Sequence, residues 1–177
     1  PRAVGHDVEG GTWAPLGAPG AGADRGIQWL PEVNDEVLVA FEAGDINHPY
    51  VLGGLWNGKD APPDKAAVSA GKTSIRIMKT RVGHVLRMAD EDSGAIKKGI
   101  QIIDSSASNK IIIDTTTKKI TIESAGDIEV KSTTNMTFTA TGNVEIKGMA
   151  VKVEAQSTLD LKATGPANLK GAVVNIN

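Results

Sequence analysis

Residues 128–147 read IEVKSTTNMTFTATGNVEIK, and this stretch decides the fold. An apolar, polar, apolar triplet begins at Ile128 and recurs at Met136 and Val144, so the period is eight residues. Alternate side chains of a β-strand point to opposite sides of the strand. Each triplet therefore predicts a short strand with one apolar face, and the period predicts one strand per octad.

The octad pattern continues in both directions through residues 111–177. At 40% apolar composition, apolar residues at both set positions of all the triplets would arise by chance about once in ten million trials. The pattern is therefore a true repeat. The pairs predicted to face the interior are Ile111 and Ile113, Ile120 and Ile122, Ile128 and Val130, Met136 and Phe138, Val144 and Ile146, Val151 and Val153, Leu159 and Leu161, Ala167 and Leu169, and Val174 and Ile176.

Charged residues occupy the outward positions of four octads, as expected of a solvent-facing side. They include Glu129 with Lys131 and Glu145 with Lys147. Octads with one apolar face are typical of a β-helix, in which strands stack about 4.8 Å apart. One chain alone would make a three-sided stack only about 14 Å tall, whereas three intertwined chains would make a prism about 43 Å long with a dry aliphatic interior. We therefore expect a homotrimer whose core is lined by the pairs above.

The front of the chain has a different composition. Five of the six aromatic residues lie before residue 57, and a Pro- and Gly-containing segment at 57–65 follows them. Alternating apolar residues predict a strand at 27–30 and a hairpin of strands at 35–42 and 50–56. Further short strands are predicted at 74–77, 84–88 and 100–103.

The whole chain is thus predicted to be all-β. We expect a small front domain at residues 1–58, a linker at 59–74, and a β-helix at 75–177 whose regular octads span 111–177. No first strand is legible in residues 1–11.

Composition excludes several classes of function. The chain has 19 Lys and Arg against 21 Asp and Glu with no basic cluster, which argues against nucleic-acid binding. No apolar run approaches the roughly 20 residues that cross a bilayer, and cysteine is absent. His6, His48 and His84 are isolated from one another in sequence. We therefore expect no catalytic, metal-binding or cofactor-binding residues, and no enzyme.

Four stretches carry a resemblance to a known family. They are LPEVNDEVLVAFE at 30–42, PYVLGGLWNG at 49–58, TRVGH at 80–84 and LKGAVVNIN at 169–177. In these stretches the chain resembles VgrG-like spike proteins, which carry an oligonucleotide/oligosaccharide-binding (OB) domain before a trimeric β-helix. The resemblance implies that the front domain is an OB-fold barrel and that the chain is a fragment or a short spike without the hub domains of such proteins.

The resemblance implies a function as well. The chain would be the central spike of a contractile injection machine: a type VI secretion system, a phage-like baseplate or an extracellular injection particle. It would be assembled in the bacterial cytoplasm as part of a baseplate and then ejected into the target cell, with transient contact to the target membrane. Hub, baseplate and inner tube proteins would adjoin its N-terminal end. A PAAR-like tip protein carrying effector cargo would bind Val174, Asn175, Ile176 and Asn177.

Two alternatives remain open at the sequence level. A polysaccharide-acting β-helix protein would normally have long loops that build a carboxylate-lined groove, and the octads leave little room for such loops. A trimeric tail adhesin would be expected to expose aromatic sugar platforms, which residues 111–177 lack. The central spike is therefore the favoured interpretation.

Overall fold

The computed structural model describes residues 13–175 and is built from short strands, with one three-residue 3-10 turn and no longer helix in the described chain. Its contacts divide the chain into two compact units, Pro1–Ile128 and Glu129–Asn177. The first unit holds every strand assigned in the described residues, and the second holds most of the octads.

The predicted front hairpin is confirmed. Strand β3 (Val37–Phe41) pairs antiparallel with β4 (Pro49–Gly54), and a β-bulge shifts the register between Leu38 and Val39. The short 3-10 turn Glu42–Gly44 begins the connection between them. Asp45 then closes the loop, because its carboxylate accepts hydrogen bonds from the backbone and side-chain amides of Asn47, both at 2.9 Å.

The strand predicted at 27–30 does not form. The chain instead makes a hairpin of two-residue strands just before it, from β1 (Ala21–Gly22) and β2 (Arg25–Gly26). The N–H of Ile27 closes this hairpin on the carbonyl of Gly20 at 3.1 Å. The residues that follow have no strand beside them, and alternation alone cannot hold an unpaired segment in a sheet.

The described part of the front domain carries small paired elements rather than a closed barrel. Besides the two hairpins, Leu16 forms an isolated parallel bridge with Val51. The segment 1–11, in which no first strand was legible, lies outside the residues that the structure describes.

The predicted linker 59–74 contains a small hairpin of its own. Strands β5 (Val68–Ser69) and β6 (Lys72–Thr73) pair antiparallel. Ala70 and Gly71 between them both have positive φ, 48° and 75°, as two-residue hairpin turns require.

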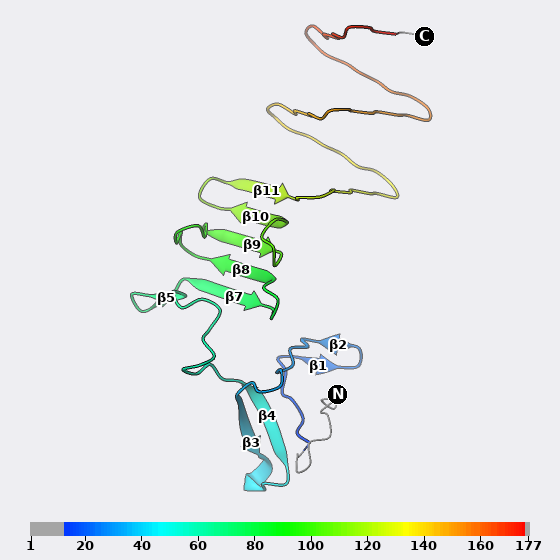
Figure 1. The fold of residues 1–177 in the computed structure, drawn as a ribbon. Helices are drawn as coiled ribbons and strands as arrows, with labels where there is room; N and C mark the ends of the chain where they lie inside the picture. Colours follow the sequence, from blue (N-terminus) through cyan, green and yellow to red (C-terminus); the bar gives the residue numbers. More distant parts are fainter. Residues whose placement is uncertain (1–12, 176–177) are drawn as a thin grey trace. The chain divides into compact units, whose positions relative to one another are not determined.

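The main sheet of the first unit is a five-stranded antiparallel meander. Its strands are β7 (Ile75–Lys79), β8 (Val85–Ala89), β9 (Gly99–Ile103), β10 (Lys110–Asp114) and β11 (Lys119–Glu123), and their order in space is their order in sequence (Figure 1). The strands predicted at 74–77, 84–88 and 100–103 are thus confirmed.

Two aspartates close the later hairpins of the meander. The carboxylate of Asp104 accepts hydrogen bonds from the hydroxyl of Ser106 at 2.8 and 3.0 Å and from backbone N–H groups of the same turn. Asp114 similarly accepts the N–H groups of Thr116 at 2.8 Å and Thr117 at 3.0 Å. Such local bonds turn the chain back on itself, which favours antiparallel pairing.

Glycine is required where β9 meets β10. Gly99 has φ of 136°, which side chains rarely adopt, and a Cβ there would collide with the carbonyl oxygen of Ile113. The close approach of the two backbones therefore depends on the missing side chain.

The structure differs here from the predicted β-helix, which was drawn from residue 75 onward. Ile111 pairs with Ile122, and Ile113 with Ile120, across a hairpin within one chain. The physical reason is the Asp114 turn. The carboxylate of Asp114 accepts the N–H groups of Thr116 and Thr117 and folds the chain back at this corner.

The second unit is extended but unpaired. No strand is assigned in the described residues after Glu123, and residues 129–175 are exposed throughout. In Figure 1 this part of the chain, yellow to red, runs back and forth in successive passes.

Candidate functional site: the apolar faces of the sheet and the octads

The described octad residues of the second unit separate apolar from charged side chains. On the charged side, carboxylate and ammonium groups two residues apart form ion pairs: Glu129 with Lys131 at 2.7 Å, Glu145 with Lys147 at 2.6 Å, and Lys152 with Glu154 at 2.5 Å. Such pairing requires both side chains to project from the same side of an extended chain. The intervening apolar residues therefore project from the other side, as the octad pattern predicts.

All these apolar side chains are exposed in the single chain. Exposed fractions include 58% for Ile128, 78% for Phe138 and 74% for Ile146. The same holds for the remaining predicted core residues of this segment: Val130, Met136, Val144, Val151, Val153, Leu159, Leu161 and Leu169. A continuous apolar stripe of this length is far more than a soluble surface normally carries, and it marks a contact face.

The backbone of the later octads also lacks backbone partners within the chain. Among the described residues, none after Glu123 makes a backbone-to-backbone hydrogen bond. Ser124 and Ala125 still hydrogen-bond to the side chain of Asn109. Farther on, the side-chain hydrogen bonds are local, such as the hydroxyl of Ser132 donating to the carbonyl of Asn135 at 3.0 Å. The segment thus offers free edges on both sides of the chain to pairing strands.

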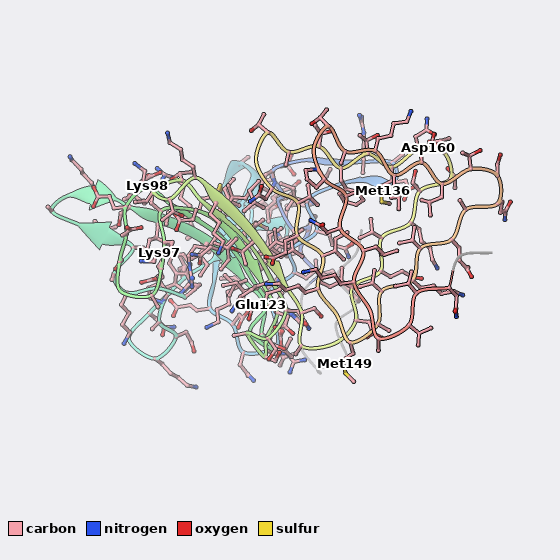
Figure 2. All side chains as sticks on the ribbon, turned by 90° about the horizontal axis from the view of Figure 1, so that it is seen from above. Lys97, Lys98, Glu123, Met136, Met149 and Asp160 are labelled. Carbon is pink, nitrogen blue, oxygen red and sulfur yellow. The ribbon has the colours of Figure 1, made fainter. Side chains whose placement is uncertain are left out.

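The octads wind about an axis. Seen from above (Figure 2), Met136 and Asp160 lie on the same side of the winding chain, whereas Met149 lies on the opposite side. Three octads of sequence separate Met136 from Asp160. One turn therefore takes about three octads, as a three-sided prism requires.

The first two octads lie in a sheet. Ile111, Ile113, Ile120 and Ile122 share one face of β10 and β11 and are exposed there. Five apolar residues of β7–β9 belong to the same face by register but were not assigned to the core by sequence reasoning: Met78, Leu86, Met88, Ile100 and Ile102. Their period-two alternation was visible in the sequence. Which face of the sheet these residues share with the octad residues is defined only by the cross-strand register.

A groove of about 590 Å³ lies on this apolar face. Trp29 from the front of the same unit lines it together with Met78, Leu86, Ile102 and Ile111. Polar groups, including His84 and Asp104, stand among the other lining residues.

The turns at the edges of the sheet carry the perturbed carboxyl groups. The hydrogen bond from the Ser106 hydroxyl, joined by those from Asn109 and Ser108, lowers the pKa of Asp104 below its ordinary value. The N–H of Thr117 does the same for the pKa of Asp114. These carboxylates stabilise turns, and Asp104 also lines the groove described above.

His48 and His84, the histidines among the described residues, make contacts with different partners. His48 contacts Asp45 at 3.1 Å, and Nδ1 of His84 accepts the N–H of Ser105 at 3.2 Å. Within residues 13–175 no three metal-ligating side chains come together, and no helix there has the length and apolarity of a membrane span.

The predicted tip is described only in part. Val174 is 45% exposed and Asn175 is exposed as well. Ile176 and Asn177 lie outside the described residues.

The front domain is similar to a known protein family. Residues 3–56 match the family model of the type VI secretion system/phage-baseplate injector OB domain. The match supports an OB domain of the injector type at the front of the chain, and the strands described after it are all-β as well. No curated protein matches the chain. The match indicates a structural role in an injection system.

Proposed function

We propose that this protein is the trimeric central spike of a contractile injection machine, similar to VgrG. Three copies would wind together through their octads into a triangular β-helix, bury the apolar stripes inside it and pair their free strand edges. The observation that carries the proposal is the exposed, unpaired and winding chain of residues 129–175.

The winding supports three copies rather than another number. A chain that takes three octads per turn without bonding to its own next turn leaves space between turns. If the pitch is about 14 Å, two further strands at the usual spacing of about 4.8 Å fill that space. Every octad then lies between strands of the other two copies, and the backbone hydrogen bonds that one copy lacks are made between copies.

The function in this proposal is mechanical. Contraction of the machine supplies the work, and the hydrogen-bonded layers of the prism transmit it to the tip, which punctures the target envelope. Hub, baseplate and inner tube proteins adjoin the OB end, and a PAAR-like cone carrying effectors binds the end that contains Val174 and Asn175. The spike is assembled in the bacterial cytoplasm and then ejected, and it uses no catalytic residue, metal or cofactor.

Light scattering combined with size-exclusion chromatography tests the oligomer. The purified chain is expected at three times its own mass of 18.4 kDa. An elongated particle should elute earlier than a compact protein of the same total mass. A particle with the mass of one chain at micromolar concentration would refute the proposal, because a lone spike chain leaves its apolar stripe in water.

A further inference from the structure

Asn57 folds its side chain back over the turn that follows β4. Its Oδ1 accepts the backbone N–H groups of Lys59 at 2.8 Å and of Asp60 at 2.7 Å. The backbone N–H of Asn57 donates in turn to the carbonyl of Asp60 at 3.0 Å. Because Oδ1 is bonded to Cγ, these contacts hold the amide carbon of Asn57 over the start of the turn, where the backbone nitrogen of Gly58 lies.

The nitrogen end of the same amide lies between two carboxylates. Nδ2 of Asn57 donates to Oε2 of Glu36 at 2.6 Å and to Oδ2 of Asp60 at 3.3 Å. Ionised carboxylates only accept hydrogen bonds, and backbone N–H groups only donate them, so this orientation satisfies both ends of the amide. The amide nitrogen therefore points away from the turn, and the amide carbonyl points into it.

Gly58 leaves the backbone nitrogen beside that carbonyl sterically open. The residue is exposed, and a Cβ built on it would meet nothing within 4 Å. Without a side chain, glycine also reaches backbone conformations that other residues resist. Asn57 is the one asparagine in the sequence with glycine after it. Asn109 is a natural comparison, because its amide is hydrogen-bonded at both ends as well but precedes Lys110.

We propose that Asn57 is a site of spontaneous deamidation. The backbone nitrogen of Gly58 attacks Cγ of Asn57, so that a new C–N bond forms and the bond from Cγ to Nδ2 breaks. Water carries the proton of the Gly58 N–H to the departing nitrogen, which leaves as ammonia, and a cyclic succinimide remains. A water molecule then opens the ring and leaves aspartate or isoaspartate at position 57.

Two features of the turn favour this reaction. The N–H groups of Lys59 and Asp60 already donate to Oδ1, where negative charge develops during the attack, so they stabilise it as an oxyanion hole does in an enzyme. The hydrogen bonds also hold the reacting groups of adjacent residues in one arrangement, which lowers the entropic cost of their approach.

Deamidation breaks the contact between this turn and the residue that precedes β3. With a carboxylate at position 57, the donor between Glu36 and Asp60 is lost, and three like charges adjoin one another. The N–H of Leu55 still donates to the carbonyl of Glu36 at 2.8 Å, so the hairpin itself keeps its closing bond. The modification therefore loosens the turn and the linker that begins at residue 59.

Peptide mass spectrometry measures the conversion in the full-length chain, aged in neutral buffer that is made with heavy-oxygen water. Each conversion replaces the amide nitrogen with a labelled oxygen. Asn57 should convert about tenfold faster than Asn109 in the same molecules, and Gly58→Ala should slow the conversion about tenfold, because a Cβ hinders the approach of the nitrogen to Cγ. The open space around Gly58 allows this variant to fold.

Three results would overturn the site. They are equal stability of Asn57 and Asn109 in the parent, an unchanged rate in Gly58→Ala, and much slower conversion of Asn57 in the folded chain than in the same chain unfolded in urea. In the last case the turn would shield the amide rather than favour the attack.

Limited digestion with trypsin tests the consequence for the linker. Asn57→Asp should be cut after the exposed Lys59 and Lys65 several-fold faster than the parent. Adding Glu36→Gln to this variant should restore slow cutting, because the glutamine amide supplies a donor to the new carboxylate. Equal cutting of all three proteins would overturn the release of the turn. Both experiments follow single residues, so their outcome is independent of the number of copies in the particle.

Discussion

Ile146 and Glu145 are adjacent residues with opposite expected roles in a trimer. In the single chain both are exposed, and Glu145 pairs with Lys147 at 2.6 Å. In the prism, Ile146 should face the axis while Glu145 stays in solvent. The informative perturbation is therefore the pair of single substitutions Ile146→Asp and Glu145→Lys.

The expected magnitudes differ widely. Ile146→Asp places three carboxylates at one level of an aliphatic interior, each costing several kcal/mol unless it is protonated. The total is on the order of 10 kcal/mol, which matches the entire stability of a typical protein. Glu145→Lys removes an ion pair whose side chains are 69% and 79% exposed, worth about 0 to 1 kcal/mol.

Light scattering on the purified variants reads out the difference. The parent chain and Glu145→Lys should both give three times the chain mass of 18.4 kDa. Ile146→Asp should fail to reach this mass. Circular dichroism before and after heating shows whether the retained particles are equally stable.

Equal behaviour of the two variants would refute the reasoning. A protein that works as a single chain exposes both side chains and should tolerate both changes, with the mass unaffected. Failure of Glu145→Lys with normal assembly of Ile146→Asp would instead mean that the inward and outward positions of the octad are reversed.

Three further predictions follow from the structure. Gly99→Ala should lower the free energy of unfolding by about 1 to 3 kcal/mol, because the added Cβ collides with the carbonyl oxygen of Ile113. Gly126→Ala, whose added Cβ would meet open space, should leave the stability unchanged. Equal unfolding temperatures of the two variants would contradict this prediction. The pKa of Asp104 is lower in the folded state than in the unfolded chain. Its contribution to folding stability is therefore present above about pH 4 and is lost as pH falls through the folded pKa. The free energy of unfolding, measured from pH 6 to pH 2, should fall less in Asp104→Asn than in the parent. Deletion of residues 170–177 should preserve the trimer mass and abolish binding to a purified PAAR-repeat cone in a pull-down, and a truncated spike that still captures the cone would contradict the assignment of the tip.

Much of the local structure was predictable because it depends on local patterns. Alternation located the strands of the meander, and it also located β3 and β4 and so predicted the front hairpin. The strand predicted at 27–30 was wrong, since its alternation had no neighbouring strand to complete it. A period of two indicates which residues of a strand share a face, but it does not indicate which strand pairs with that strand's edge.

Only part of the candidate contact surface could be predicted from the sequence. The octad residues were found from sequence because a repeat of eight stands out at any position. Met78, Leu86 and Ile102 were missed, because their face becomes defined only when the cross-strand register aligns them with Ile111.

The sequence by itself determined that this protein is all-β, that its front and rear differ in composition, and that residues 111–177 present apolar and charged sides in octads. Only the tertiary structure decided that the first two octads fold back as an antiparallel hairpin while later octads wind onward without partners. The physical reason is that side-chain alternation is a property of one strand, whereas pairing depends on turn geometry. At Asp114 a carboxylate captures two following N–H groups and returns the chain to its own neighbour, whereas no strand pairing is assigned in the described residues after Glu123.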